Sequence, residues 1–188
     1  MGETEYSEAL KQGKKEYRAR IAKGQFPYLP VLDEILSEAD IKTEQYMGLV
    51  QVPLDFVVGT STMGRTYSFA ANFMPILDEE TEFAVKWSNL SDAQMNEGIR
   101  DPIKAFEYMN RYYVLEGNKR VSVLKYFNAV SIPAIVTRKI PTARPVDISR
   151  MNAETLDMEL EKGYADMQAG HTKSATQVFA DIRRDYNV

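Results

Sequence analysis

The chain has 188 residues, of which 44% are hydrophobic and 27% charged, so it fits one globular domain with an appendage. It contains no cysteine and a single histidine, His171, which excludes disulfides, thiolate chemistry and a histidine zinc cluster. The net charge of −4 argues against broad, non-specific DNA binding. The sequence shows no apolar run long enough for a membrane span and no secretory signal, so we expect a cytoplasmic protein without membrane contact.

Residues 1–46 are expected to form a helical extension. Residues 6–23 contain six cations, and Leu10, Lys14, Tyr17 and Ile21 share one face at helical spacing, which predicts a helix with most cations outward. A solvated face is the simpler interpretation of these cations, and a phosphate or nucleic-acid patch is the alternative. Two prolines then break the helix, and a short second helix is predicted before residue 37.

The main domain is expected over residues 47–145. Residues 48–58 have the β-branched content of a strand, with Pro53 at a strand end or on an edge strand. Residues 59–73 have the polar, glycine-containing composition of a surface loop, and Arg65 is its only cation.

Two helices are predicted next. Residues 81–90 hold the only tryptophan, Trp87, which we expect in the core. Ser91 or Asp92 could cap a second short helix, with Gly98 as its C-terminal glycine.

A β-hairpin is predicted at residues 103–115, with a tight turn at Met109 and Asn110. A helix should follow and end near residue 128, and residues 131–140 supply another strand. The order strand, strand, turn, helix, strand indicates an α+β fold, a small mixed sheet covered by helices.

The turn between the hairpin and its helix is the candidate binding site. It contains Glu116, Gly117, Asn118, Lys119 and Arg120. A helix N-terminus presents unpaired N–H groups and the positive end of its dipole, the glycine can adopt a left-handed conformation, and the two cations add charge. This combination predicts an anion site, and Glu116 there could simply pair with one of the neighbouring cations.

Residues 49–140 resemble the ParB/sulfiredoxin superfamily. The resemblance rests on the Glu116-Gly117-Asn118-Lys119-Arg120 turn, the helix after it and the strand Ile132-Pro133-Ala134-Ile135-Val136. Upstream, Gly64-Arg65 and the segment from Gly98 to Ile103 are similar to the arginine loop and the glycine-then-proline segment of the family.

The resemblance implies a nucleotide ligand, CTP, ATP or ADP, with Mg²⁺ as an optional companion. Its phosphates would lie at Gly117, Lys119 and Arg120. Arg65 and Arg100 could reach the same phosphates. Asn118 stands where sulfiredoxin has its catalytic cysteine, so reductase activity is excluded. The chain is also too short and too acidic after this domain for the DNA-binding helices of partition proteins.

Residues 146–188 are expected to form a C-terminal helical arm. Asn152 is a candidate N-cap for a helix with Leu156, Leu160, Tyr164 and Met167 on its apolar face, and a second helix is predicted from Ser174. Residues 151–188 resemble the toxin-wrapping arm of RelB-type antitoxins, which would imply a toxin-like protein partner.

Three functions follow from these patterns. The first is a ParB-like nucleotide-binding domain with a regulatory or interaction role, and nucleic acid is disfavoured as its partner. The second is an ATP-dependent phosphotransferase or hydrolase in which Glu116 is the base or a magnesium ligand, as the kinase branch of the family implies. The third is an antitoxin-like module that acts through residues 151–188.

Overall fold

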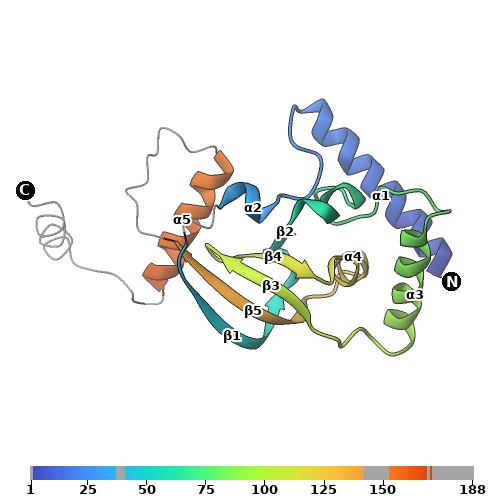
Figure 1. Cartoon of the computed structure of the whole chain (residues 1–188). Coiled ribbons are helices and arrows are strands. Elements are labelled where there is room, and N and C mark those ends of the chain that lie inside the picture. Colours follow the sequence, from blue (N-terminus) through green and yellow to red (C-terminus); the bar gives the residue numbers. More distant parts are fainter. Residues whose placement is uncertain (1, 37–40, 142–152, 169, 171–188) are drawn as a thin grey trace, which may run out of the picture. The chain divides into compact units, whose positions relative to one another are not determined.

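Five strands form one mixed sheet in the order β1-β5-β3-β4-β2 (Figure 1). The computed structural model describes residues 2–36, 41–141, 153–168 and 170. The chain divides into two compact units, Met1–Arg144 and Pro145–Val188, and each is described by itself. The strands are β1 (Ile41–Pro53), β2 (Val57–Thr60), β3 (Ile103–Tyr108), β4 (Arg111–Glu116) and β5 (Ser131–Pro141). The helices are α1 (Gly2–Ala22), α2 (Leu32–Ile35), α3 (Glu82–Asn96), α4 (Asn118–Tyr126) and α5 (Ala153–Gln168), with the 3-10 helices η2 (Leu54–Phe56) and η3 (Met63–Ser68).

The predicted hairpin is confirmed as β3 and β4, which pair antiparallel at the centre of the sheet. Met109 and Asn110 both have positive φ, 50° and 58°, as a two-residue hairpin turn of type I′ requires at its two central residues. The buried carboxylate of Glu107 accepts a hydrogen bond from the Asn110 backbone N–H at 3.0 Å and pairs with Arg138 of β5. The turn is therefore fixed both by its own backbone and by the neighbouring strand.

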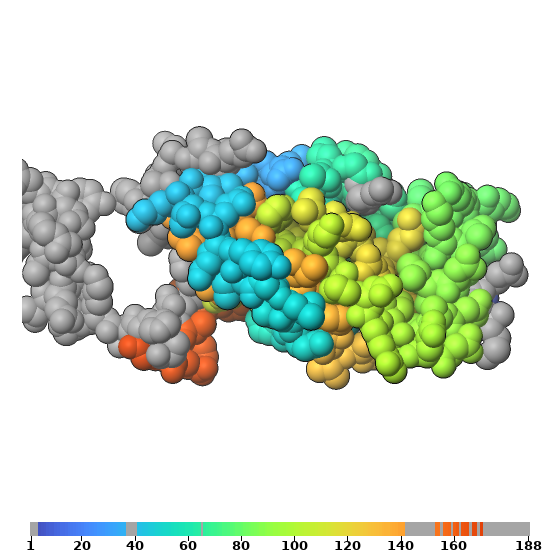
Figure 2. All heavy atoms as spheres, turned by 60° about the horizontal axis from the view of Figure 1, so that its bottom comes forward, coloured from blue at the N-terminus to red at the C-terminus, as the bar shows by residue number. Residues whose placement is uncertain are grey.

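The expected α+β class is confirmed, because β5 returns through α4 to lie parallel to β3 and antiparallel to β1. The strand predicted at residues 48–58 is divided: β1 ends at Pro53, η2 follows, and β2 begins at Val57. Strand β1 forms one edge of the sheet, where Figure 2 shows its side chains along the surface. Pro53 is its last residue, as expected of a proline at a strand end. The expected boundary between residues 46 and 47 falls within this strand.

The prediction of a polar surface loop at residues 59–73 is wrong. Gly59 and Thr60 complete β2, which pairs parallel with β4, and Phe69 and Phe73 belong to the main core. Thr60 is only 1% exposed because its hydroxyl donates to the Val114 carbonyl oxygen at 3.1 Å. A small hydroxyl side chain bonded to the backbone can be buried at little energetic cost, so composition alone misplaced this segment.

Helix α4 covers the sheet, and α3 packs on α4. Val121 and Leu124 of α4 join the strand side chains in the core. Trp87, fully buried as predicted, donates its indole N–H to the Ser122 hydroxyl at 2.8 Å. This bond fixes α3 against the helix that begins at the candidate site.

Helix α3 is continuous, so the two predicted helices are one. Thr81 caps it, its hydroxyl oxygen accepting from the Ala84 N–H at 3.2 Å. Ser91 is buried inside this helix and is not a cap. Gly98, with φ of 78°, ends the helix as predicted.

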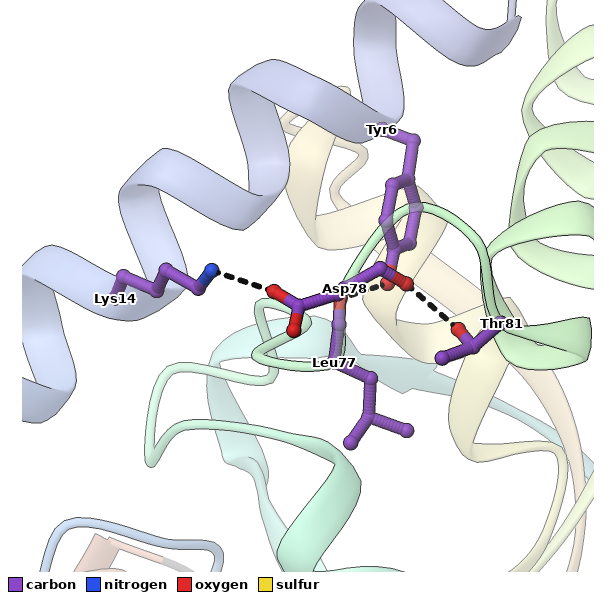
Figure 3. Close-up of polar contacts among 5 residues, drawn as sticks. All are labelled: Tyr6, Lys14, Leu77, Asp78 and Thr81. Atoms are coloured by element: carbon purple, nitrogen blue, oxygen red, sulfur yellow. Dashed lines mark hydrogen bonds and ion pairs between the residues drawn. The ribbon is translucent and has the colours of Figure 1, made fainter.

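Helix α1 packs on α3 through Tyr6, Ala9 and Leu10. The Tyr6 hydroxyl donates to the Leu77 carbonyl oxygen at 2.6 Å, and Lys14 pairs with Asp78 at 2.8 Å (Figure 3). Ile21, predicted on the apolar face, is 52% exposed. The buried face is thus set by the first half of the helix, where α3 lies against it.

The second unit contains α5, which confirms a helix at residues 153–168. Leu160, Tyr164 and Met167 are exposed on it. The predicted cap Asn152, His171 and the helix predicted from Ser174 lie outside the described residues. None of the described helices is both long and apolar enough to span a membrane.

Replacing Gly13 by alanine tests how α1 is docked. An ideal Cβ at Gly13 would lie 2.1 Å from the Pro75 carbonyl oxygen, a backbone atom. Alanine is the better helix former by about 1 kcal/mol, but the overpacking should dominate and destabilise the protein by about 1–3 kcal/mol. Urea unfolding measures this, with Gly64→Ala as the control because a Cβ there meets nothing within 4 Å. A Gly13→Ala protein as stable as the control would contradict this packing.

Candidate functional site

The predicted turn joins the end of β4 to the start of α4. Gly117 is the N-cap of α4 and has φ of 108° and ψ of 20°, a left-handed conformation. A Cβ at this position would lie 2.5 Å from Cγ2 of Ile103 on β3. Both the dihedral angle and the close approach of β3 require glycine here.

The first turn of α4 presents its backbone N–H groups without a side-chain cap. The first intrahelical bond runs from the Val121 N–H to the Gly117 carbonyl oxygen at 3.1 Å, so the N–H groups of residues 118–120 precede it. Gly117 has no side chain that could accept from them. Together with the helix dipole, these donors make the turn attractive to an anion.

An open cavity of about 210 Å³ lies at this helix start. Its walls come from three parts of the chain: the end of β4 with the turn, the segment after η3, and α3. The lining residues are Phe69, Phe83, Leu90, Leu115, Glu116, Gly117, Asn118, Lys119 and Arg120. Five residues of the predicted site thus line one cavity, with an apolar wall opposite the polar turn.

The two cations of the turn are held differently. Nζ of Lys119 lies over the ring of Phe83, 4.7 Å from its centroid. Arg120 donates from Nη1 to the carbonyl oxygens of Asp101 and Pro102, which uses two of its five N–H donors. Arg120 therefore ties the turn to the segment before β3 and retains donors for a ligand.

Glu116 pairs with Lys104 of β3 at 2.8 Å, and not with Lys119 or Arg120 as the sequence suggested. The hairpin register places Lys104 opposite Glu116, which sequence spacing could not reveal. The hydrogen bond and charge of Lys104 lower the pKa of the Glu116 carboxyl, and the charge of Arg120 lowers it further. Glu116 is exposed and is held in its ionised form.

Asn118 is buried, with 6% of its surface exposed. Its Nδ2 donates to the Thr60 hydroxyl oxygen at 3.4 Å, which connects α4 to β2. Its Oδ1 has no hydrogen-bond partner among the described residues. A buried acceptor without a partner is costly, and a buried water would supply the missing donor.

Of the two outlying arginines, only Arg100 has a side chain within the described part of the structure. Arg100 is exposed and is not among the residues that line the cavity. The backbone of Arg65 lies in η3, and its side chain lies outside the described part of the structure. The sequence patterns did not indicate Thr60, Phe83 and Leu90, because only the packing of β2 and α3 against α4 brings these residues to the turn.

The residues of the turn suit the phosphates of a nucleotide better than they suit Mg²⁺. The N–H groups at the helix start and the two cations fit a phosphorylated ligand. Within the described ranges, no three His, Asp or Glu side chains form a group that could hold a metal ion. Glu116 is the one carboxylate among the cavity-lining residues.

No protein-family model and no curated protein matches this chain. Among solved structures, it is similar to sulfiredoxin from Arabidopsis thaliana, with 22% identity and a TM-score of 0.34 over 47% of this chain and 82% of that one. It is also similar to the C-terminally truncated chromosome-partitioning protein ParB from Caulobacter crescentus complexed with CTP-gamma-S, with 11% identity and a TM-score of 0.33 over 74% of this chain and 65% of that one. Both agree with a ParB/sulfiredoxin-like fold. With TM-scores this low they assign no ligand to this chain.

Gly117→Ala tests the geometry of the turn. Alanine at positive φ costs roughly 1–2 kcal/mol, and the clash with Ile103 should add about 1–3 kcal/mol. Gly98→Ala is the matched control, because Gly98 also has positive φ but a Cβ there meets nothing within 4 Å. Chemical unfolding should show the larger loss for Gly117→Ala. Equal losses would mean that Ile103 does not constrain the turn.

Proposed function

We propose that the turn at residues 116–120 binds the phosphates of a nucleotide and that the domain has a regulatory or interaction role. The observation that carries the proposal is the glycine-capped start of α4 in the 210 Å³ cavity, where uncapped N–H groups lie beside Lys119 and Arg120. A phosphate offers several acceptor oxygens and negative charge, which match these donors.

The apolar wall supports a nucleotide over inorganic phosphate. Phe83 and Leu90 of α3 and Leu115 of β4 line the same cavity as the donors. A base or ribose could pack against these side chains while the phosphates contact the turn.

Calorimetry with CTP, ATP, ADP and GTP, with and without Mg²⁺, tests the proposal. CTP, ATP and ADP are the ligands that the resemblance of the turn to the ParB/sulfiredoxin superfamily implies, and GTP tests selectivity among bases. Removing one charged hydrogen bond to phosphate costs about 1.5–3 kcal/mol, so Lys119→Gln should weaken binding about ten-fold or more. The control is Lys86→Gln, which removes an exposed cation on α3. The proposal fails if none of the nucleotides binds, or if both variants bind alike.

Turnover through Glu116 is the alternative. Its lowered pKa makes Glu116 a weak base at neutral pH, because an efficient general base has a pKa near the working pH. An ionised carboxylate beside a phosphate site is better suited to contact Mg²⁺. Enzymatic turnover therefore has less support than binding.

Glu116→Gln separates binding from turnover. We expect the variant to bind nucleotide at least as tightly as the unmodified protein, because a negative charge near the phosphates is removed. Phosphate release measured with ATP and CTP should be absent in both proteins. Release by the unmodified protein that is lost in Glu116→Gln would establish the enzymatic alternative.

The antitoxin-like role stays a prediction. Leu160, Tyr164 and Met167 of α5 are exposed and share a face at helical spacing, as expected of a partner-binding helix. The rest of the proposed arm, residues 171–188, lies outside the described residues.

A further inference from the structure

A stripe of cations runs along one face of α1. It consists of Lys11, Lys14, Lys15 and Arg18, spaced i, i+3, i+4 and i+7, so they share one helix face. Lys11, Lys15 and Arg18 are exposed, and among the described residues none of these three has an ion-pair partner. Lys14 is neutralised by Asp78 at 2.8 Å (Figure 3). Three cations of the stripe are therefore available to an external anion.

An aromatic cluster lies at the end of α1, made of Tyr17, Phe26, Tyr28 and Tyr67. The ring of Tyr28 is at the centre, with centroids 5.4 Å from Tyr17, 5.6 Å from Phe26 and 5.0 Å from Tyr67. Phe26 is 52% exposed and Tyr67 is 55% exposed. Two large rings thus remain in contact with solvent although they touch a packed aromatic partner.

The stripe and the aromatic cluster meet in a second open cavity, of about 320 Å³. It is lined by Lys14, Tyr17, Arg18, Tyr28 and Ile76. None of these residues lines the cavity at the turn, so this surface is separate from the proposed nucleotide site.

We propose that this surface binds single-stranded nucleic acid. The stripe covers eight residues of helix, a rise of about 10 Å at 1.5 Å per residue, which suits successive phosphates of a strand better than one phosphate group. The exposed rings of Phe26 and Tyr67 offer faces on which unpaired bases can stack, and stacking of this kind is available only to unpaired bases. The overall charge of −4 confines the binding to this local patch and makes it sensitive to salt.

Fluorescence anisotropy with labelled dT12 and U12 oligonucleotides and a hairpin duplex, between 20 and 200 mM KCl, tests the proposal. With three available cations, a plot of the logarithm of the binding constant against the logarithm of the salt concentration should have a slope of about −2. The single strands should bind more tightly than the duplex. No binding of the single strands at 20 mM KCl, or tighter binding of the duplex, would overturn the proposal.

Two sets of variants locate the contacts. The double variant Lys15→Gln with Arg18→Gln should reduce the slope of the salt dependence to about −0.7. The control, Lys42→Gln with Lys86→Gln, removes two exposed cations elsewhere and should leave this slope unchanged. Phe26→Ala with Tyr67→Ala should weaken binding roughly five-fold or more. The assignment to this surface would be refuted if the double variant of Lys15 and Arg18 and the double variant of Lys42 and Lys86 changed the slope equally. Unchanged binding after loss of the two rings would refute it as well. Fluorescence of the buried Trp87 checks that every variant is folded.

Discussion

The left-handed backbone of Gly117, held against Ile103 of β3, is the constraint on which the rest of the central module depends. It allows β4 to leave the sheet and α4 to begin within one residue. As a result, α4 lies directly on the sheet, and β5 can return parallel to β3. The same residue leaves the helix start without a side-chain cap, so a fold requirement and the candidate binding property have one cause.

The helices support this turn in layers. Trp87 of α3 is bonded to Ser122 of α4, and Tyr6 of α1 packs its ring edge against Trp87 at 5.5 Å. A change in the position of α4 would therefore disturb a buried indole hydrogen bond, which is expensive to break. The cavity at residues 116–120 is lined by residues of α3 and α4, and Glu116, which also lines it, is exposed and pairs with Lys104.

Local patterns predicted the parts of the structure that local forces determine. The Met109-Asn110 turn, the strands beside it and the helix after Gly117 follow from residues close in sequence. The cap residues Ser91 and Asp92 predict two helices, yet Ser91 lies buried inside one continuous helix α3. The segment at residues 59–73 was predicted at the surface because its hydroxyl groups look polar, although Thr60 is satisfied by the backbone of β4.

The sequence by itself determined the α+β order, the glycine turn and the cluster of charges in it, because each depends on residues within a few positions of one another. Only the tertiary structure decided that Glu116 pairs with Lys104, that Phe83 lies beneath Lys119, and that Asn118 is buried against Thr60. It also decided that Lys14 and Arg18 of α1 line one cavity with Tyr28. These contacts join residues far apart in the chain, and their register and packing are set by the whole core.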